Sequence, residues 1–158
     1  MNPKRLILVS TLFAILVAAV YVTAAYSQGK SPPVNAIGSA GVAIRGYDSV
    51  AYFTEGAPRM GKPEFATTYN GARWLFSTAD HKALFESDPK KYAPAYGDYC
   101  AYGAASGYLV KIEPDAWAIR DGRLFLNYDR SVQKLWAASP DHFIKAADAK
   151  YPGLIATQ

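Results

Sequence analysis

The fold of this chain is decided by residues 69–77, YNGARWLFS, and by residues 120–128, RDGRLFLNY, which follow 51 positions later. Each stretch has an Asn-Gly or Asp-Gly dipeptide near its start, and these dipeptides readily adopt the positive φ angles of a two-residue hairpin turn. Apolar and aromatic residues flank both dipeptides. Two β-hairpins are therefore predicted, with strands at 64–69, 72–76, 116–120 and 123–128.

Each hairpin is followed by a signal for the start of a helix. Ser77 or Thr78 in the first copy, and Asp129 in the second, can accept hydrogen bonds from the free amides of a helix N-terminus. Pro89 and Pro140 oppose helix continuation, because proline lacks an amide hydrogen and restricts the residue before it. Helices are therefore expected at 79–87, 130–138 and 140–150.

The chain matches itself at this spacing beyond the turns. The matched pairs are apolar or aromatic and include Trp74 with Phe125, Leu84 with Leu135, and Tyr92 with Phe143. Upstream, at a spacing of 50, Asp48 corresponds to Asp98. We interpret the pattern as two duplicated ββα units, each a hairpin plus a helix, that share one core. The predicted fold class is α+β, preceded by an N-terminal hydrophobic segment.

The N-terminus has the pattern of an export signal. Lys4 and Arg5 form a basic head, and residues 6–20 carry no charge. Small residues suited to cleavage follow, so a signal peptide over 1–27 is expected. Residues 6–26 are also uncharged and long enough to form a membrane anchor that is not cleaved. Either alternative places the rest of the chain outside the cytoplasm, in the periplasm.

The rest of the chain has the composition of a folded domain. We expect a linker at 28–40, a domain at 41–153 and a tail at 154–158. With 51% hydrophobic and 19% charged residues, there is ample apolar surface for a core. The 17 basic and 13 acidic residues leave a net charge of +4, too weak and too diffuse for nucleic-acid binding. No recognised catalytic motif is present, so no enzyme activity is expected.

His81 is the first candidate site residue. It precedes Leu84 and Phe85 by three and four positions, so all three lie on one face of the expected helix and the imidazole should point inward. Val132 occupies the matching position of the second copy. The imidazole of His81 therefore either has a functional role or is a structural group at the edge of the core that makes one hydrogen bond. His142 is interpreted as an ordinary surface or capping residue.

Cys100 is the only cysteine, so an intramolecular disulfide and a cysteine-only metal cluster are excluded. It lies among tyrosines and glycines, which predicts a loop or bulged strand packed against aromatic rings. Outside the cytoplasm an unpaired thiol risks oxidation, so the alternatives are burial, metal or redox function, or a covalent dimer. Asp48 is a further candidate, either as an oxygen ligand or as a turn cap.

Residues 69–77, followed by His81, Phe85 and the sequence DPKKY at 88–92, resemble a YHS domain. The wider chain, over about 41–153, resembles the exported, single-cysteine YHS-domain proteins of bacteria. The resemblance implies an exported domain built around the first hairpin. It also implies where a metal ion would be held.

In the metal-binding members of that family, the three cysteine positions fall on Ala51, Ser77 and His81 of this sequence. None of the three positions carries a thiolate, and His81 is still a competent metal ligand at the third. The resemblance implies a transition-metal site with His81 as a ligand, Cys100 as the source of a thiolate, and Asp48, a tyrosine oxygen or water completing the shell. An imidazole paired with a thiolate suits copper, and zinc is the second choice.

Two functions are open on these residues. The first is an exported metal-binding domain that handles, delivers or senses copper, with the metal ion and a periplasmic or membrane protein as partners. The second is a degenerate YHS module without metal, which acts as a structural or protein-interaction domain. The losses at Ala51 and Ser77 favour the second. Nucleic acid is not an expected partner, and membrane contact is expected only if the N-terminal segment is not cleaved.

Overall fold

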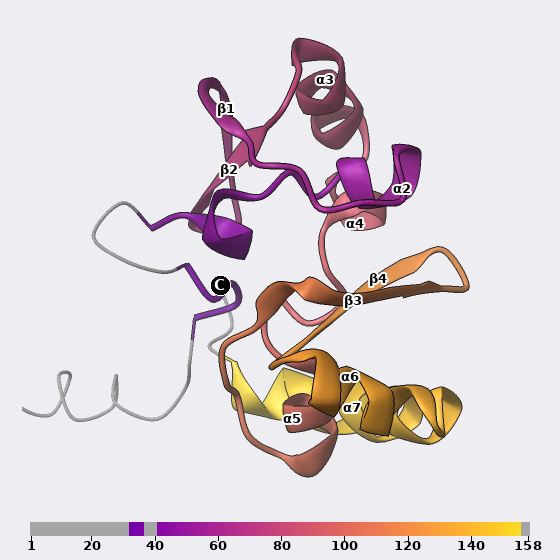
Figure 1. Cartoon of the computed structure of the whole chain (residues 1–158). Helices are drawn as coiled ribbons and strands as arrows, with labels where there is room; N and C mark the ends of the chain where they lie inside the picture. The colour runs from indigo at the N-terminus through magenta and orange to yellow at the C-terminus, as the bar shows by residue number, and fades with distance from the viewer. Residues whose placement is uncertain (1–31, 37–40, 156–158) are drawn as a thin grey trace, which may run out of the picture. The chain divides into compact units, whose positions relative to one another are not determined.

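The computed structural model describes residues 32–36 and 41–155 of the chain (Figure 1). The expected signal or anchor segment at 1–27 and most of the linker lie outside the described residues. Within the described ranges, no helix is both long enough and apolar enough to cross a lipid bilayer. The described residues therefore belong almost entirely to the expected domain.

The described residues form a mixed α and β fold, so the predicted α+β class is confirmed. Two antiparallel sheets of two strands each, β1–β2 and β3–β4, are separated and followed by helices (Figure 1). In chain order the elements are the 3-10 helix η1 (Ala43–Gly46), α2 (Ala51–Thr54), β1 (Lys62–Tyr69), β2 (Ala72–Phe76), α3 (Ala79–Ser87), α4 (Pro89–Tyr92), α5 (Ala101–Ser106), β3 (Glu113–Arg120), β4 (Arg123–Asn127), α6 (Arg130–Ala137) and α7 (Pro140–Leu154).

Both predicted hairpins are present, and their strands pair in the same register at a spacing of 51 residues. The φ angle is 50° at Asn70 and 50° at Asp121, and the glycines that follow have φ angles of 74° and 73°. Positive φ at both central residues is what a type I′ turn requires. A shift in register interrupts each ladder at the matching place, near the start of β1 and of β3. The dipeptides therefore determine the pairing of both hairpins.

Helices α3 and α6 follow the hairpins at the expected places, and each begins at a side-chain cap. Thr78 Oγ1 accepts a hydrogen bond from the backbone amide of His81 at 3.1 Å. Asp129 Oδ1 accepts one from the amide of Val132 at 2.8 Å. Thr78, and not Ser77, is therefore the cap in the first copy. A cap of this kind contributes about 1 kcal/mol.

Two expectations need correction. The loop expected around Cys100 ends at Cys100 itself, because Cys100 caps helix α5, which ends at Gly107 in the left-handed conformation. The sequence did not signal this helix because it is short and contains a glycine. Helix α7 runs to Leu154 and not to residue 150, with Pro152 inside it. Pro152 lies in the last turn, where it removes few helical hydrogen bonds.

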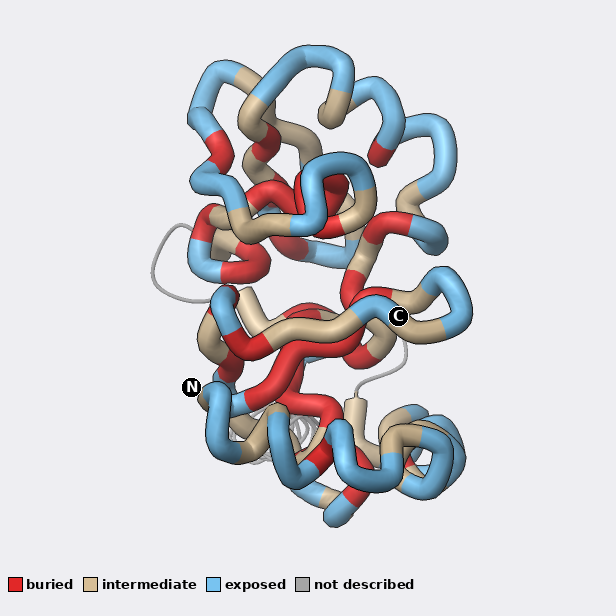
Figure 2. Tube along the Cα trace, turned by 45° about the vertical axis from the view of Figure 1, so that its right-hand side comes forward, coloured by how far each residue is buried: buried red, intermediate tan, exposed pale blue. Residues whose placement is uncertain are grey.

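Buried apolar side chains form two clusters. The first draws on both hairpins and includes Trp74 of β2, Phe85 of α3 and Leu124 of β4. The second packs Phe125 of β4 against helices α5, α6 and α7, with Trp136 as its largest side chain. Figure 2 shows buried positions in red within both hairpin regions and exposed positions in pale blue along the outer turns of the helices. The expected single core is thus divided in two.

Contacts between the first and second halves hold the segment from η1 to α2 in place. The hydroxyl of Tyr52 in α2 donates to the carbonyl of Pro114 at 3.0 Å, and its ring meets Trp117 edge-on at 5.3 Å. The backbone amide of Ile44 donates to Asp98 Oδ2 at 2.7 Å. Because the turn between η1 and α2 carries Asp48, these contacts also position the candidate site.

Candidate functional site

Three segments meet at the candidate site in the first half. Asp48 lies in the turn between η1 and α2, Ser77 follows the last residue of β2, and His81 lies in the first turn of α3. The hairpin turn determines where β2 ends, and the cap at Thr78 determines where α3 begins. The sequence placed Asp48 and His81 in one candidate metal site, and the structure brings their side chains into direct contact.

The Asp48 carboxylate is fully buried and accepts five hydrogen bonds from this chain. Its Oδ1 atom accepts from the amides of Val50 at 2.9 Å and Ala51 at 3.3 Å. Its Oδ2 atom accepts from Ser77 N at 2.8 Å, from Ser77 Oγ at 2.6 Å and from His81 Nδ1 at 2.6 Å. Hydrogen bonds from the protein therefore replace the water that a buried carboxylate loses.

The contact with Asp48 assigns the protonation of the His81 ring. An ionised carboxylate has no proton to donate, so with Asp48 as a carboxylate the proton on this contact is assigned to His81 Nδ1. The other ring nitrogen, Nε2, lies 3.1 Å from Thr54 Oγ1. The His81 side chain is 12% exposed, so the expectation that it points inward is confirmed. Nε2 is the ring atom available for chemistry.

Asp48, His81 and Thr54 follow the order of carboxylate, imidazole and hydroxyl that is used in nucleophilic catalysis. However, Thr54 Oγ1 has one proton and two acceptors within reach, the Val50 carbonyl at 3.2 Å and His81 Nε2 at 3.1 Å. The helix carbonyl therefore competes with the imidazole for this proton, and the contact alone does not assign Thr54 as a nucleophile.

Cys100 lies in the second half and has different partners. Its Sγ atom accepts hydrogen bonds from the amides of Tyr128 at 3.2 Å and Gly103 at 3.4 Å, and it lies 3.8 Å from Asn127 Oδ1. The side chain is buried, and this burial raises the pKa of the Cys100 thiol. The group is therefore a protonated, poorly reactive thiol near neutral pH.

His81 contacts Asp48, Ser77 and Thr54, whereas Cys100 contacts Gly103, Asn127 and Tyr128, so the two side chains belong to different hydrogen-bonded groups. Cys100, Tyr128 and Val132 line a separate, largely apolar cavity of about 240 Å³. Tyr128 and Val132 are the counterparts of Ser77 and His81 at the spacing of 51. The second half therefore has an apolar cavity at the position where the first half has a polar cluster.

The donor set does not fit the three-ligand metal centre that the family resemblance implies. Ala51 has no donor atom in its side chain, and the Ser77 hydroxyl is engaged by Asp48. Only Nε2 of His81 remains among the three positions. Over residues 32–36 and 41–155, no group of three or more His, Cys, Asp or Glu side chains is placed to hold a metal ion.

Asp98 is a buried carboxyl that the sequence reasoning did not select as a site residue. Its Oδ2 atom accepts from the Ile44 amide, whereas its Oδ1 atom has no hydrogen-bond partner among the described residues. Burial raises the pKa of Asp98 well above its ordinary value. Its correspondence with Asp48 was the available signal, but the two carboxyls have different partners.

Thr54 was also missed, because helix α2 is a single turn without periodicity in the sequence. His142 lies on the exposed surface of α7, with its ring edge-on to Phe143, as expected of a surface residue.

No family model, no curated protein and no solved structure matches this chain. The YHS resemblance therefore stays a prediction from the residues that carry it.

Proposed function

We propose that this chain is an exported, YHS-like binding module without enzyme activity, in which the Asp48–Ser77–His81 cluster replaces a metal centre. One observation carries the proposal: the Asp48 carboxylate is buried and takes five hydrogen bonds, all from this chain. These bonds tie together α2, the end of β2 and α3. A metal ion held by the same three segments would join the same elements.

The cluster contributes to stability through charge-assisted hydrogen bonds. Each such bond to a buried carboxylate is worth about 1.5–3 kcal/mol, and a buried acceptor left without its donor costs a comparable amount. The role of His81 is then to satisfy Asp48, and its imidazole is a structural group. This role agrees with the alternative that His81 is satisfied by a hydrogen bond at the edge of the core.

The two halves are proposed to be duplicated ββα units that have diverged at this position. The common hairpin register supports the duplication. In each half, the amide that follows the second strand of the hairpin donates to a side chain from the segment before the hairpin. Ser77 N donates to Asp48 Oδ2, and Tyr128 N donates to Cys100 Sγ. One copy has a carboxylate as the acceptor and the other has a thiol.

The place of action is proposed to be the periplasm. The basic head at Lys4 and Arg5 and the uncharged residues 6–20 support export. The binding partner on this proposal is a periplasmic or membrane protein or a small molecule, and not nucleic acid. Contact with the membrane follows only if the N-terminal segment is not cleaved.

A second candidate function is copper binding at His81. Asp48 holds the proton on Nδ1, which leaves the lone pair of Nε2, 3.1 Å from Thr54 Oγ1, as the donor to a metal, and metal-binding histidines are commonly oriented by a carboxylate in this way. A single imidazole would form an open site, with water or a partner protein supplying the other ligands. Such a site suits the handling or delivery of copper more than tight storage.

Metal analysis separates the two candidates. The protein would be purified from an exported preparation without chelator or affinity tag, as the host processes it, and its metals measured by mass spectrometry. The proposed module is metal-free and takes up neither Cu(I) nor Zn(II), with His81→Ala lowering the melting temperature. Near-stoichiometric copper that is lost in His81→Ala but kept in Cys100→Ser would contradict it and establish the second candidate.

A further inference from the structure

A cavity of about 300 Å³ lies away from the Asp48 cluster, where the first hairpin, α4, β4 and the end of α7 meet. Its walls include three aromatic side chains and three cationic side chains, namely Tyr69, Trp74, Tyr151, Lys90, Lys91 and Arg123. None of its lining residues is acidic. A volume of this size is at the lower end of small-molecule sites.

The polar backbone atoms of the cavity wall are largely occupied as acceptors. The Pro33 carbonyl accepts from the Tyr151 hydroxyl at 2.8 Å, and the Gly97 carbonyl accepts from the Asn35 amide at 2.7 Å. The Pro94 carbonyl accepts from the Gly97 amide at 3.3 Å. These three carbonyls are therefore already used as acceptors, which favours a ligand that accepts hydrogen bonds over one that donates them at this part of the wall.

The cationic side chains that line the cavity differ in whether an acidic side chain balances their charge. Arg123 forms two hydrogen bonds with Asp148, at 2.8 and 3.0 Å, and these bonds lower the pKa of the Asp148 carboxyl. Its charge is thus balanced and its position is fixed. Lys90 and Lys91 form no ion pair among the described residues. Both lysines are exposed and line the cavity, and the Lys91 ammonium lies 4.9 Å from the centre of the Tyr92 ring.

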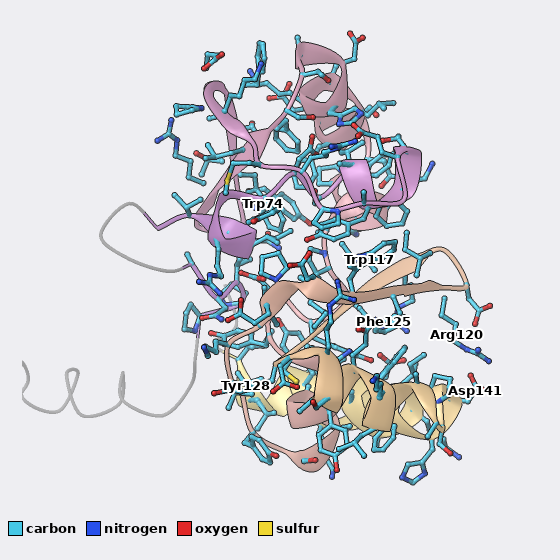
Figure 3. The ribbon with its side chains drawn as sticks, viewed as in Figure 1. Trp74, Trp117, Arg120, Phe125, Tyr128 and Asp141 are labelled. Atoms are coloured by element: carbon cyan, nitrogen blue, oxygen red, sulfur yellow. The ribbon has the colours of Figure 1, made fainter. Side chains whose placement is uncertain are left out.

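The second half has an ion pair at the corresponding position. At the spacing of 51, Arg120 replaces Tyr69 and Asp141 replaces Lys90. These two side chains form a paired contact, at 2.8 and 2.9 Å, between the tip of the β3–β4 hairpin and the start of α7 (Figure 3). The first half has an aromatic ring and a cation there, without a carboxylate to pair with.

We propose that this cavity binds a small organic anion, a carboxylate attached to a planar ring. The ring would lie against the aromatic walls, and the carboxylate would accept hydrogen bonds from Lys90 and Lys91. The cavity lining does not include Asp48, Ser77 or His81, so this site is independent of the metal question. The proposed site gives the binding module a class of ligand. If the cavity does not bind such a ligand, the conclusions about the Asp48 cluster still stand.

The test is titration of the full chain, as the host exports it, with 4-hydroxybenzoate as the probe. Binding is followed by calorimetry and by shifts of the backbone amide signals of Ala95 and Gly97, which line the cavity. The neutral isostere 4-hydroxybenzamide and inorganic phosphate are titrated in parallel. We expect the carboxylate to bind most tightly and its affinity to fall as salt is added.

The decisive variant is Lys90→Glu with Lys91→Glu, and the matched control is Lys134→Glu with Lys145→Glu. The control changes the net charge equally at exposed lysines outside the cavity. We expect at least a tenfold loss of affinity in the first variant and no change in the control, with both variants folded by thermal melt. Equal loss in both, equal binding of the amide, or no binding of 4-hydroxybenzoate to the unmodified chain overturns the proposal.

Discussion

The two halves of the domain share a backbone plan and differ in the chemistry placed on it. In the first half, β1, β2 and α3 bring Ser77 and His81 to a buried carboxylate, Asp48. In the second half, β3, β4 and α6 bring Tyr128 and Val132 to a cavity beside a buried thiol, Cys100. Figure 3 shows Tyr128 near α5 and α6, on the side of the second hairpin where this cavity lies.

This difference shows that the turns and helix caps determine the arrangement of the backbone, whereas a few side chains determine the chemistry of each half. Both halves keep the Asn-Gly or Asp-Gly turn and the side-chain cap of the next helix. An acceptor for the amide after the hairpin is also kept, as Asp48 in one half and Cys100 in the other. The polar cluster can therefore be tested by comparing matched positions.

The largest expected effect comes from removing the two acceptors in turn. Asp48→Ala leaves five donors without their partner, four of them backbone amides or a ring nitrogen held in place, and we expect a loss of about 3–5 kcal/mol. Cys100→Ala removes a weaker acceptor, and we expect about 1–2 kcal/mol. Urea unfolding of the two variants measures both values. A smaller loss for Asp48→Ala than for Cys100→Ala would contradict the comparison.

The next effect comes from giving the first half the residue of the second. His81→Val removes the Nδ1 donor and leaves Asp48 Oδ2 with the two donors of Ser77. We expect a loss of about 2 kcal/mol in the free energy of unfolding, measured by urea denaturation. His81→Asn is the control, because its amide can still donate and should recover part of the loss. A more stable His81→Val protein would show that the imidazole is not a structural group.

A third prediction concerns Asp98, the counterpart of Asp48 in the second half. The pKa of Asp98 is raised by burial, so the folded state keeps its proton at pH values where the unfolded state has lost it. The contribution of Asp98 to stability is therefore present at low pH and is lost as pH rises above the ordinary Asp value towards the raised one. Asp98→Asn should remove this loss, so the variant gains stability relative to the native chain as pH rises above the ordinary Asp value.

Urea midpoints of the native chain and of Asp98→Asn at several pH values give the measurement. The expected outcome is a difference between the two proteins that grows in favour of the variant as pH rises. A difference that is constant with pH would mean that Asp98 has the same proton affinity in the folded and unfolded states, against the consequence drawn from its burial.

The smallest expected effect is on the exposed pair of the second half. Arg120 and Asp141 are 40% and 77% exposed in their side chains, so solvent screens their attraction. Asp141→Asn should cost less than about 1 kcal/mol, and 0.5 M salt should remove most of that cost, both measured by urea unfolding. A loss as large as that of Asp48→Ala would mean that this surface pair, and not the buried cluster, carries the stability.

The parts of the fold that the sequence predicted are those with local causes. The two hairpins follow from dipeptides that favour positive φ. Helices α3 and α6 follow from capping side chains that accept a hydrogen bond from the backbone amide three positions later. Helices α2 and α5 were missed because they are short, and the cap of α5 is a cysteine, an unusual residue at that position. Local sequence patterns do not predict helices as short as α2 and α5.

The candidate site was predicted in part for the same reason. The inward direction of His81 follows from its spacing to Phe85 on one helix face. Its contact with Asp48 joins residues 33 positions apart, and only the packing of η1, α2 and the first hairpin creates it. The partners of Cys100, the amides of Gly103 and Tyr128, likewise depend on how α5 packs against the second hairpin.

The most direct test of the central claim is the tautomer of His81, measured by nitrogen-15 NMR of its ring with and without one equivalent of Zn(II) or Cu(I). The account predicts a proton on Nδ1, an unprotonated Nε2 and the same spectrum after metal is added. A proton on Nε2 would remove the donor that Asp48 requires. A metal-dependent change at His81 would show that the cluster binds the ion it is proposed to replace.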